Sequence, residues 1–474
     1  MKNIFRLLFG TLALVAIVGC EQEGVDNQDG KVKALPTPTA TANVQENNII
    51  VAWDAVDFAI YYELSLNGGE AERVETTAYR YESLDYNTSY TISIVAVSAD
   101  QTKFLNSDPK VLEVEIPALE VMAYREWYAI APVTAVSNNG RWAVGGFDKN
   151  AVMIDLFNNR SEDILNMEFY DVADNGLAVG SRFRGADDGG TAIYYKDGEY
   201  FDVDLGDLVD DLYCSALCGV TPDGEYAVGW FYDYNESTYY TSLFGSIVPF
   251  AYDIVNDRVT MLQSDDTYQQ YRGGTQCTAV SPDRRIIGYE QAGSLGIFGV
   301  TWANEDAEWE YIYLKTDEER APVEALGGAG TTLLSPSGRY VYGEGVMEDI
   351  NGEIAAAYDF EKDEVMWFPT FANGSVTAMT DGGIAFFNNV PYGYGTTSYV
   401  IDTNKDYETS YTLVEWLKAE HNLDLEDYII EGIIIIGASA DGRTLVGMTS
   451  TMSGYVSFAI SLDGKPMPEK VVEE

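Results

Sequence analysis

The sequence has almost no histidine and few basic residues. His421 is the one histidine in 474 residues, and 28 lysines and arginines stand against 76 acidic residues, for a formal net charge of −48. Nucleophilic triads and many zinc sites need histidine, so we expect no catalytic residue of that kind. His421 lies beside acidic residues and is expected at the surface or capping a short helix. The acidic surface repels nucleic acid, which we exclude as a partner.

Cysteine is equally scarce. Apart from Cys20, the chain holds Cys214, Cys218 and Cys277, with no paired C-x-x-C. A disulfide among the three stays open, because spacing does not give connectivity. The chain also lacks a phosphate loop, a dinucleotide fingerprint and an EF-hand loop. We therefore expect no cofactor and no metal site, with weak calcium binding left open for the acidic loops at 185–190, 264–268 and 346–353.

Long apolar runs are missing after the first twenty residues, where MKNIFR precedes the run LLFGTLALVAIV and the chain then reads Gly19-Cys20. A run of this length between basic residues and a small-residue site is typical of a signal peptide. The segment I-V-G-C resembles the lipobox of bacterial lipoproteins. That resemblance implies a signal peptide over 1–19 and acylation of Cys20. An ordinary signal peptide is the alternative.

Residues 20–32 follow as the acylated cysteine and a polar tether, EQEGVDNQDGKV. The acidic run is similar to the surface-export signals of some Gram-negative lipoproteins, and a plain spacer explains it equally well. We expect an outer membrane lipoprotein held by its acyl chains and exposed at the cell surface. The sequence leaves open whether it lies on the periplasmic or the external side.

Residues 33–117 are predicted to form a β-sandwich. Short alternating strands such as IIVAWDAV and YTISIVAVSAD are separated by turn signals at intervals of roughly 8–12 residues. Pro36, Trp53, Leu84 and Tyr90 occupy positions similar to those of fibronectin type III domains. The resemblance implies that Trp53 and Leu84 build the core and that Tyr90 is the corner tyrosine. It also implies a domain that spaces and presents others.

One motif recurs through residues 118–474. A small polar turn ending in glycine precedes a short apolar strand that ends in glycine again, as in AVSNNGRWAVGG and GASADGRTLVGM. The turn position is taken by Gly140, Gly176, Gly224, Arg284, Gly338, Gly383 and Gly442. A tight hairpin needs a residue with positive φ, which glycine adopts at little cost. Arg284 departs from the pattern, so its turn is expected to differ or to be strained.

The repeats predict a β-propeller. Their mean spacing is about 50 residues, a period found in propellers and solenoids. Each repeat continues with further apolar strands, which makes about four strands per unit. We therefore predict an all-β chain, a fibronectin type III-like sandwich followed by a seven-bladed propeller, with six or eight blades as alternatives. An open β-solenoid is the rival fold. The stretch EVMAYREWYAI at 120–130 is the expected strand donor to the last unit.

The segment TLVEWLKAEHNLDLEDY at 412–428 interrupts the strands. Leu413, Trp416, Leu417 and Glu420 fall at helical spacing, which predicts one short helix between the sixth and seventh units. This helix followed by ASADGRTLVG resembles the HAF-type extracellular repeat proteins of bacteria. That family is defined by its repeats, so the resemblance implies no active site.

Tyrosine-rich loops are the predicted ligand site. The chain has 34 tyrosines, and many gather in loops that should share one face of a propeller. Tyrosine stacks on sugar rings and hydrogen-bonds with little loss of entropy. The predicted site residues are Trp230, Tyr232, Asp233, Tyr234, Asp265, Asp266, Tyr268, Tyr271, Tyr392 and Tyr394. Packing of the loops on themselves would explain the same composition.

The expected function is that of a lipid-anchored binding or adhesion protein of the cell envelope. Its sandwich would present a propeller that recognises a glycan or protein ligand. Two alternatives stay open: a propeller-type glycoside hydrolase or lyase acting on extracellular glycans, and a purely structural surface scaffold. Carboxylate pairs do not separate them, because acidic residues are everywhere in this chain.

Overall fold

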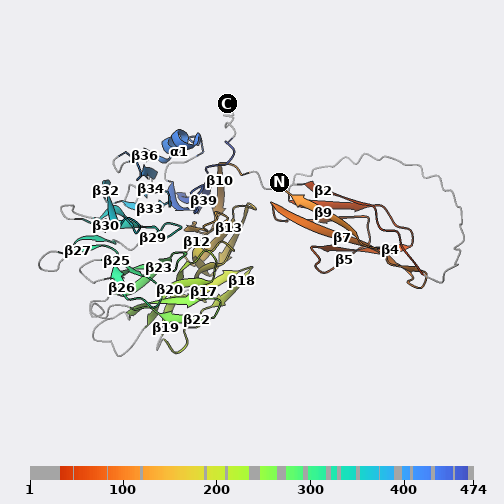
Figure 1. Cartoon of the computed structure of the whole chain (residues 1–474), viewed down its shortest axis with the longest axis horizontal. Coiled ribbons are helices and arrows are strands. Elements are labelled where there is room, and N and C mark those ends of the chain that lie inside the picture. The colour runs from red at the N-terminus through yellow and green to blue at the C-terminus, as the bar shows by residue number, and fades with distance from the viewer. Residues whose placement is uncertain are drawn as a thin grey trace. The chain divides into compact units, whose positions relative to one another are not determined.

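The chain divides into two compact units, Met1–Ala118 and Leu119–Glu474. The computed structural model describes residues 32–45, 47–82, 84–117, 121–185, 189–208, 212–233, 246–263, 274–291, 297–316, 322–327, 333–347, 353–372, 374–388, 398–405, 409–428, 433–451 and 454–467. Nearly all regular structure in these ranges is β-strand (Figure 1). Within them, no helix is long and apolar enough to cross a membrane.

The first unit contains two antiparallel sheets around one core. The sheet orders are β2-β3-β6 and β5-β4-β7-β9, and the short β1 pairs in parallel with β8. Buried side chains from both sheets form a single cluster. The strands are β1 (Lys33–Ala34), β2 (Ala40–Gln45), β3 (Asn48–Trp53), β4 (Ala59–Leu66), β5 (Glu72–Val74), β6 (Ala78–Tyr81), β7 (Thr88–Ser98), β8 (Phe104–Leu105) and β9 (Lys110–Ile116).

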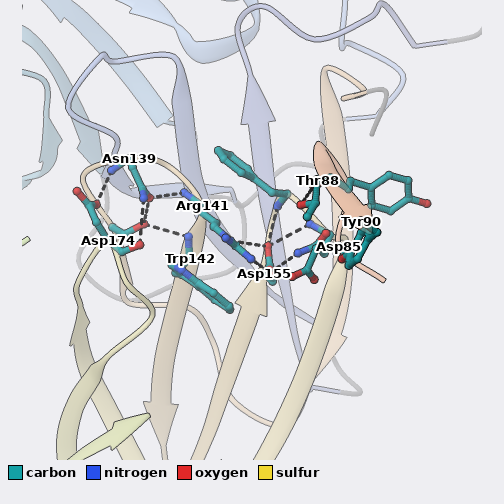
Figure 2. Close-up of polar contacts among 12 residues, drawn as sticks. Asp85, Thr88, Tyr90, Asn139, Arg141, Trp142, Asp155 and Asp174 are labelled. Carbon is teal, nitrogen blue, oxygen red and sulfur yellow. Dashed lines mark hydrogen bonds and ion pairs between the residues drawn. The ribbon is translucent and has the colours of Figure 1, made fainter. Parts of the chain in front are cut away.

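Three residues singled out in the first unit lie where the sequence predicts. Trp53 is buried in the core and meets Tyr62 edge-on, with ring centroids 5.2 Å apart. Leu84 is partly buried and packs against the same cluster. The hydroxyl of Tyr90 accepts a hydrogen bond of 2.8 Å from the backbone N–H of Asp85 (Figure 2). This bond has the form of a tyrosine corner, in which the phenol ties a strand to the connection before it.

The second unit contains seven antiparallel sheets among its described residues. In six of these sheets, the four strands of one repeat pair side by side in chain order. The inner strands, which come first in each repeat, are β11 (Ala135–Val136), β15 (Met167–Val172), β19 (Leu212–Val220), β23 (Thr275–Val280), β29 (Leu333–Leu334), β33 (Ser375–Met379) and β37 (Ile434–Ala438). The second strands are β12 (Trp142–Phe147), β16 (Ala178–Arg182), β20 (Tyr226–Asp233), β24 (Ile286–Gln291), β30 (Tyr340–Val346), β34 (Ile384–Asn388) and β38 (Thr444–Thr451).

The remaining strands complete each sheet outward. The third strands are β13 (Asn150–Asp155), β17 (Thr191–Lys196), β21 (Ser246–Asp253), β25 (Ile297–Trp302), β31 (Glu353–Asp359), β35 (Ser398–Asp402) and β39 (Gly454–Ser461). The outer strands are β14 (Arg160–Leu165), β18 (Glu199–Asp202), β22 (Arg258–Met261), β26 (Trp309–Tyr311), β32 (Glu364–Ala372) and β36 (Tyr411–Thr412). Two further strands, β27 (Leu314–Thr316) and β28 (Pro322–Leu326), extend the sheet of β30. A single 3₁₀ turn, η1 (Gly206–Leu208), follows β18 among the described residues.

The last sheet takes its outer strand from the start of the unit. Strand β10 (Tyr124–Ala129) pairs with β39 from Tyr124 opposite Ile460 to Ala129 opposite Tyr455 (Figure 1). The sheet order is therefore β10-β39-β38-β37. This is the strand donation predicted from the stretch at 120–130. It joins the two ends of the second unit in one sheet.

Each sheet packs on the next through its own apolar core. Leu177 and Val179 of the second sheet, for example, lie with Phe231 of the third. The cluster of Trp127, Val152 and Val446 joins the seventh sheet to the first. The contacts thus run from sheet to sheet and return to the first one.

The one α-helix of the described residues, α1 (Leu413–His421), lies between the sixth and seventh sheets, as predicted. Thr412 caps its N-terminus, because its hydroxyl accepts from the backbone N–H of Glu415 while the Glu415 carboxylate accepts from the N–H of Thr412. Leu413, Trp416 and Leu417 are its buried residues.

Candidate functional site

The repeated turn has the same backbone in all seven sheets. Its last residue donates a backbone hydrogen bond of 2.8 to 3.0 Å to the carbonyl three residues earlier. That residue has φ between +67° and +82° in every repeat, including Arg284 at +67°. The turn at Arg284 was expected to differ from the others or to be strained. Its backbone matches that of the other repeats, so the second alternative holds, since a side chain at such φ is costly. Its guanidinium stacks over the Tyr226 ring at 4.7 Å, a cation–π contact that offsets part of the cost.

A hydroxyl holds most of these turns closed. In six repeats it accepts a hydrogen bond from a backbone N–H four or five residues further on. The residues are Ser137, Thr221, Ser281, Ser335, Thr380 and Ser439. The repeated small polar residues of the motif thus act as local side-chain caps.

Neighbouring turns also bind one another. The N–H of Asn139 donates to the Asp174 carboxylate at 2.7 Å, and its side-chain amide donates to the Asp174 carbonyl (Figure 2). The N–H of Ala440 donates to the carbonyl of Asn138, which links the seventh repeat to the first. The Asn138 amide also donates to the carbonyl of Pro336, 198 residues away. The turns therefore gather at one end of the second unit.

A second repeated feature lies on the inner strands. Five of them carry a β-bulge where they pair with the second strand. In each of these strands the pairing register skips one residue near the repeated turn. The skipped residues are Tyr170, Cys218, Thr278, Thr377 and Ile436, in chain order. Bulges re-aim side chains and are frequent beside binding sites.

The second glycine of the motif faces these bulges. A Cβ on Gly180, Gly229 or Gly288 would lie 1.9 to 2.1 Å from a carbonyl oxygen of the inner strand. Such a distance leaves no room for a side chain, so glycine is required at this position in these three strand pairs. The sixth sheet departs from this pattern, because Phe387 stands opposite its bulge.

The bulges open onto a central cavity of about 130 Å³, lined by residues from all seven inner strands. Four of the bulged residues, Tyr170, Cys218, Thr278 and Ile436, lie on its wall. Asp171 is the one charged residue among those that line it. A nearly uncharged cavity in a chain of net charge −48 suits a neutral polar group or several water molecules.

Asp171 ties two inner strands together at the cavity wall. Its carboxylate accepts backbone hydrogen bonds from Val172 at 2.8 Å and from Val220 of the neighbouring sheet at 2.9 Å. Burial raises the pKa of Asp171 to about 7, although both N–H donors favour the charged form. The group therefore titrates near neutral pH.

The phenol and thiols around Asp171 stay protonated. Burial raises the pKa of Tyr170 far above its usual value, and its hydroxyl donates to the Glu168 carboxylate at 3.0 Å. Burial also raises the pKa of the Cys218 thiol to about 12, and that of Cys277 well above its ordinary value. Among the described residues, Cys214, Cys218 and Cys277 form no disulfide. Protonated thiols of this kind are poor nucleophiles and poor metal ligands.

Three of the predicted ligand residues lie on β20, at the end of the sheet away from the repeated turn. Trp230 and Tyr232 are both half-buried there, and Asp233 ends the strand. Tyr234, Asp265, Asp266, Tyr268, Tyr271, Tyr392, Tyr394 and Cys20 lie outside the described residues. The strands that flank these loops, β20, β23 and β34, all meet them at the end opposite the repeated turns.

The indole nitrogen of Trp230 is the notable polar atom at this end. Nε1 is buried and makes no hydrogen bond of full geometry among the described residues. It lies close enough to the Cys218 sulfur to lower the pKa of that thiol through a weak hydrogen bond, although burial raises the same pKa by more. Cys218 in turn lines the central cavity. Trp230 therefore connects the predicted loop end with the cavity.

His421 lies in a separate hollow of about 320 Å³ beside α1. It is the last residue of the helix and meets Trp416 edge-on, with ring centroids 4.6 Å apart. Burial lowers the pKa of His421. Among the described residues no three histidine, cysteine or acidic side chains gather as metal ligands would.

No known protein family and no curated protein matches the chain. Solved structures similar in fold to the larger part of the chain are β-propellers. The propeller domain of a trilobed protease from Pyrococcus furiosus has 12% identity and a TM-score of 0.43, over 72% of this chain and 100% of that one. An oligogalacturonate lyase in complex with manganese has 10% identity and a TM-score of 0.45, over 73% and 91%. The extracellular domain of a one-component system from B. thetaiotaomicron has 13% identity and a TM-score of 0.38, over 71% and 39%.

The cavity residues were not predicted from the sequence. They sit in the same repeated motif, a few residues before each turn, where Thr134, Tyr170, Cys218 and Thr278 align. A polar residue recurring inside an otherwise apolar inner strand was the available signal.

Proposed function

We propose that this chain is a lipid-anchored protein of the bacterial cell envelope, in which a fibronectin type III-like sandwich presents a seven-bladed β-propeller that binds a ligand. The Asp85–Tyr90 hydrogen bond supports the fibronectin-like domain. Seven sheets with packed neighbours, and a last sheet completed by β10, support the blade number. The anchor is the acylated Cys20, behind the signal peptide at 1–19.

The ligand site is proposed to combine the loop end of the propeller with the central cavity, which extends along the inner strands to the repeated turns at Asn138, Pro222 and Ser335. The observation that carries this proposal is the set of bulges that line a nearly uncharged cavity in a strongly acidic chain. A neutral polar ligand avoids charge repulsion there, and sugars fit that description. The proposed ligand is therefore a glycan. A protein that inserts an uncharged side chain is the alternative.

The cavity favours binding over hydrolysis. Glycosidases use two carboxyl groups on either side of the bond that is cleaved. The residues lining the cavity include Asp171 as their one carboxylate. A hydrolase or lyase acting here would degrade an oligosaccharide and lose that activity on the Asp171→Asn change. A structural scaffold would bind nothing in a screen of glycans and surface proteins.

Changing Trp230 to phenylalanine should weaken binding of the glycan found in such a screen about fivefold. The change removes one N–H donor and keeps an aromatic ring, and a hydrogen bond contributes about 1 kcal/mol. Stability should fall by no more than about 1 kcal/mol, because Nε1 has no hydrogen bond of full geometry to lose among the described residues of the free protein. Titration calorimetry measures the affinity. Trp309→Phe on the outer strand β26 is the matched control, and an equal loss in that variant would place the site elsewhere.

The Cys20→Ser variant should leave the membrane fraction and appear in the soluble envelope or medium. Acylation requires the thiol, so the variant cannot carry the acyl chains that hold the protein to the bilayer. Fractionation and fatty-acid labelling of the two proteins measure this. A variant that still sediments with membranes and carries label would overturn the anchoring proposal.

A further inference from the structure

The first unit carries an exposed apolar patch at one end. We call it the foot patch, and its residues are Val32, Phe58, Ile60, Phe104 and Leu105. Phe58 is 67% exposed, Ile60 55% and Leu105 48%, although each belongs to a well-formed strand or turn. The rings of Phe58 and Phe104 stack with centroids 4.9 Å apart and planes 15° apart. The patch therefore joins the β3–β4 connection to the connection after β7.

The backbone of Phe58 is strained in order to present this ring. Its φ is +69°, a left-handed conformation that costs an aromatic residue roughly 1–2 kcal/mol. The turn is fixed by a hydrogen bond of 3.1 Å from the N–H of Ala59 to the carbonyl of Val56. Glycine or asparagine would adopt this turn at lower cost. A strained, outward-facing phenylalanine is a feature that points to a role outside the fold.

The chain enters the first unit at this patch. Lys33 pairs with Phe104 and Ala34 with Leu105, and the N–H of Leu35 donates to the Leu105 carbonyl at 3.0 Å. Val32 follows Cys20 by twelve positions in the sequence. A chain of that length spans at most about 40 Å. An acylated Cys20 therefore keeps the foot patch close to the bilayer surface.

Charge at the patch differs from that of the chain as a whole. Lys33 and Lys103 flank Phe104 in a protein with only 28 basic residues. The exposed Lys103 pairs with Asp100 at 3.2 Å, and Asp57 adjoins Phe58. Basic and acidic residues are thus nearly balanced here, so the general repulsion between this chain and lipid phosphates is weak at this end.

We propose that the foot patch inserts into the headgroup region of the bilayer that holds the acyl chains, and so orients the first unit on the membrane. Aromatic and aliphatic side chains on a small surface, with lysines beside them, are typical of interfacial contact. The inference rests on the proposed lipid anchor for its setting. The patch itself is testable without that anchor.

The test uses the mature chain from residue 20 with Cys20→Ser, which has no acyl chain, and vesicles of phosphatidylethanolamine with phosphatidylglycerol. We expect the parent chain to bind these vesicles weakly in a flotation assay. Phe58→Gly should lower the binding about tenfold, because the variant has no aromatic ring at this position to move from water into the bilayer. Thermal stability of Phe58→Gly should be equal or higher, since glycine relieves the positive φ. Phe157→Ser, at a side chain 49% exposed in the second unit, is the matched control and should bind as the parent does.

Three results would overturn the proposal. The first is a parent chain that does not bind these vesicles, and the second is a Phe58→Gly variant that binds them equally well. The third is a parent chain that dimerises in size-exclusion chromatography and becomes monomeric with Phe58→Gly, which would make a second copy the occupant of the patch. Failure of the anchor shows separately, as a wild-type chain without fatty-acid label, and leaves the vesicle result standing.

Discussion

Gly229→Ala should destabilise the second unit by about 3 kcal/mol, at the upper end of the usual cost of overpacking. The new Cβ would lie 2.1 Å from the Ala216 carbonyl oxygen and 3.1 Å from the Leu217 Cα. Both are backbone atoms of the bulged strand β19, so no side-chain rotation relieves the clash. The bulge or the pairing of β19 with β20 must change instead. Denaturant unfolding of the full chain measures the loss.

A matched variant separates this clash from the general effect of losing a glycine. Gly185→Ala places its Cβ where no atom lies within 4 Å, and Gly185 does not have a positive φ. Its stability should stay within about 0.5 kcal/mol of the parent. Equal stability of Gly229→Ala and the parent would mean that the strand pair accommodates the methyl group, and the steric account of the second glycine would fail. A changed cavity in Gly229→Ala should also weaken ligand binding, because Cys218 sits on the same bulge.

The turn glycine of the motif was predictable, whereas the second glycine was not explained by sequence. A position that needs a positive φ is usually occupied by glycine, which is visible in the local sequence. Arg284 stood out because it takes the place of that glycine in one repeat. The second glycine depends on pairing register, since its neighbour is a carbonyl of another strand. Register between strands cannot be read from one strand alone. For the same reason the sequence did not predict the cavity, because its lining residues come together only where the seven inner strands meet.

The helix and the donated strand were predictable for different reasons. Leu413, Trp416 and Leu417 follow helical spacing, and Thr412 and Glu415 form a capping box in the first turn. The donated strand was inferred from the need of a propeller to protect its sheet edges. The predicted ligand loops, in contrast, were chosen by composition. Trp230 and Tyr232 lie on the described part of β20, at the predicted end, and their role stays a prediction.

A chain that begins at residue 132 should lose cooperative folding, whereas one that begins at 119 should keep it. The shorter chain lacks β10, which forms six residue pairs with β39. It also lacks Tyr124 and Trp127, which are 4% and 9% exposed. Removing one buried aromatic side chain costs about 3–5 kcal/mol, so two of them take most of a typical stability of 5–15 kcal/mol. The bare edge of β39 would in addition invite pairing between molecules.

Single substitutions on β10 give the finer test of the same prediction. Trp127→Ala in the full chain should cost about 4 kcal/mol, because this side chain fills the core between the seventh and first sheets. Tyr128→Ala changes the next residue, which points away from that core and is 79% exposed, and should cost less than about 0.5 kcal/mol. Circular dichroism, size-exclusion chromatography and thermal unfolding compare the two truncations and the two variants. If the chains from 119 and 132 unfold alike, and Trp127→Ala matches Tyr128→Ala, then β10 does not hold the last sheet to the first. Because the two residues are adjacent on one strand, their side chains point to opposite faces of the sheet, and Trp127 is the one that lies in the core between the seventh and first sheets.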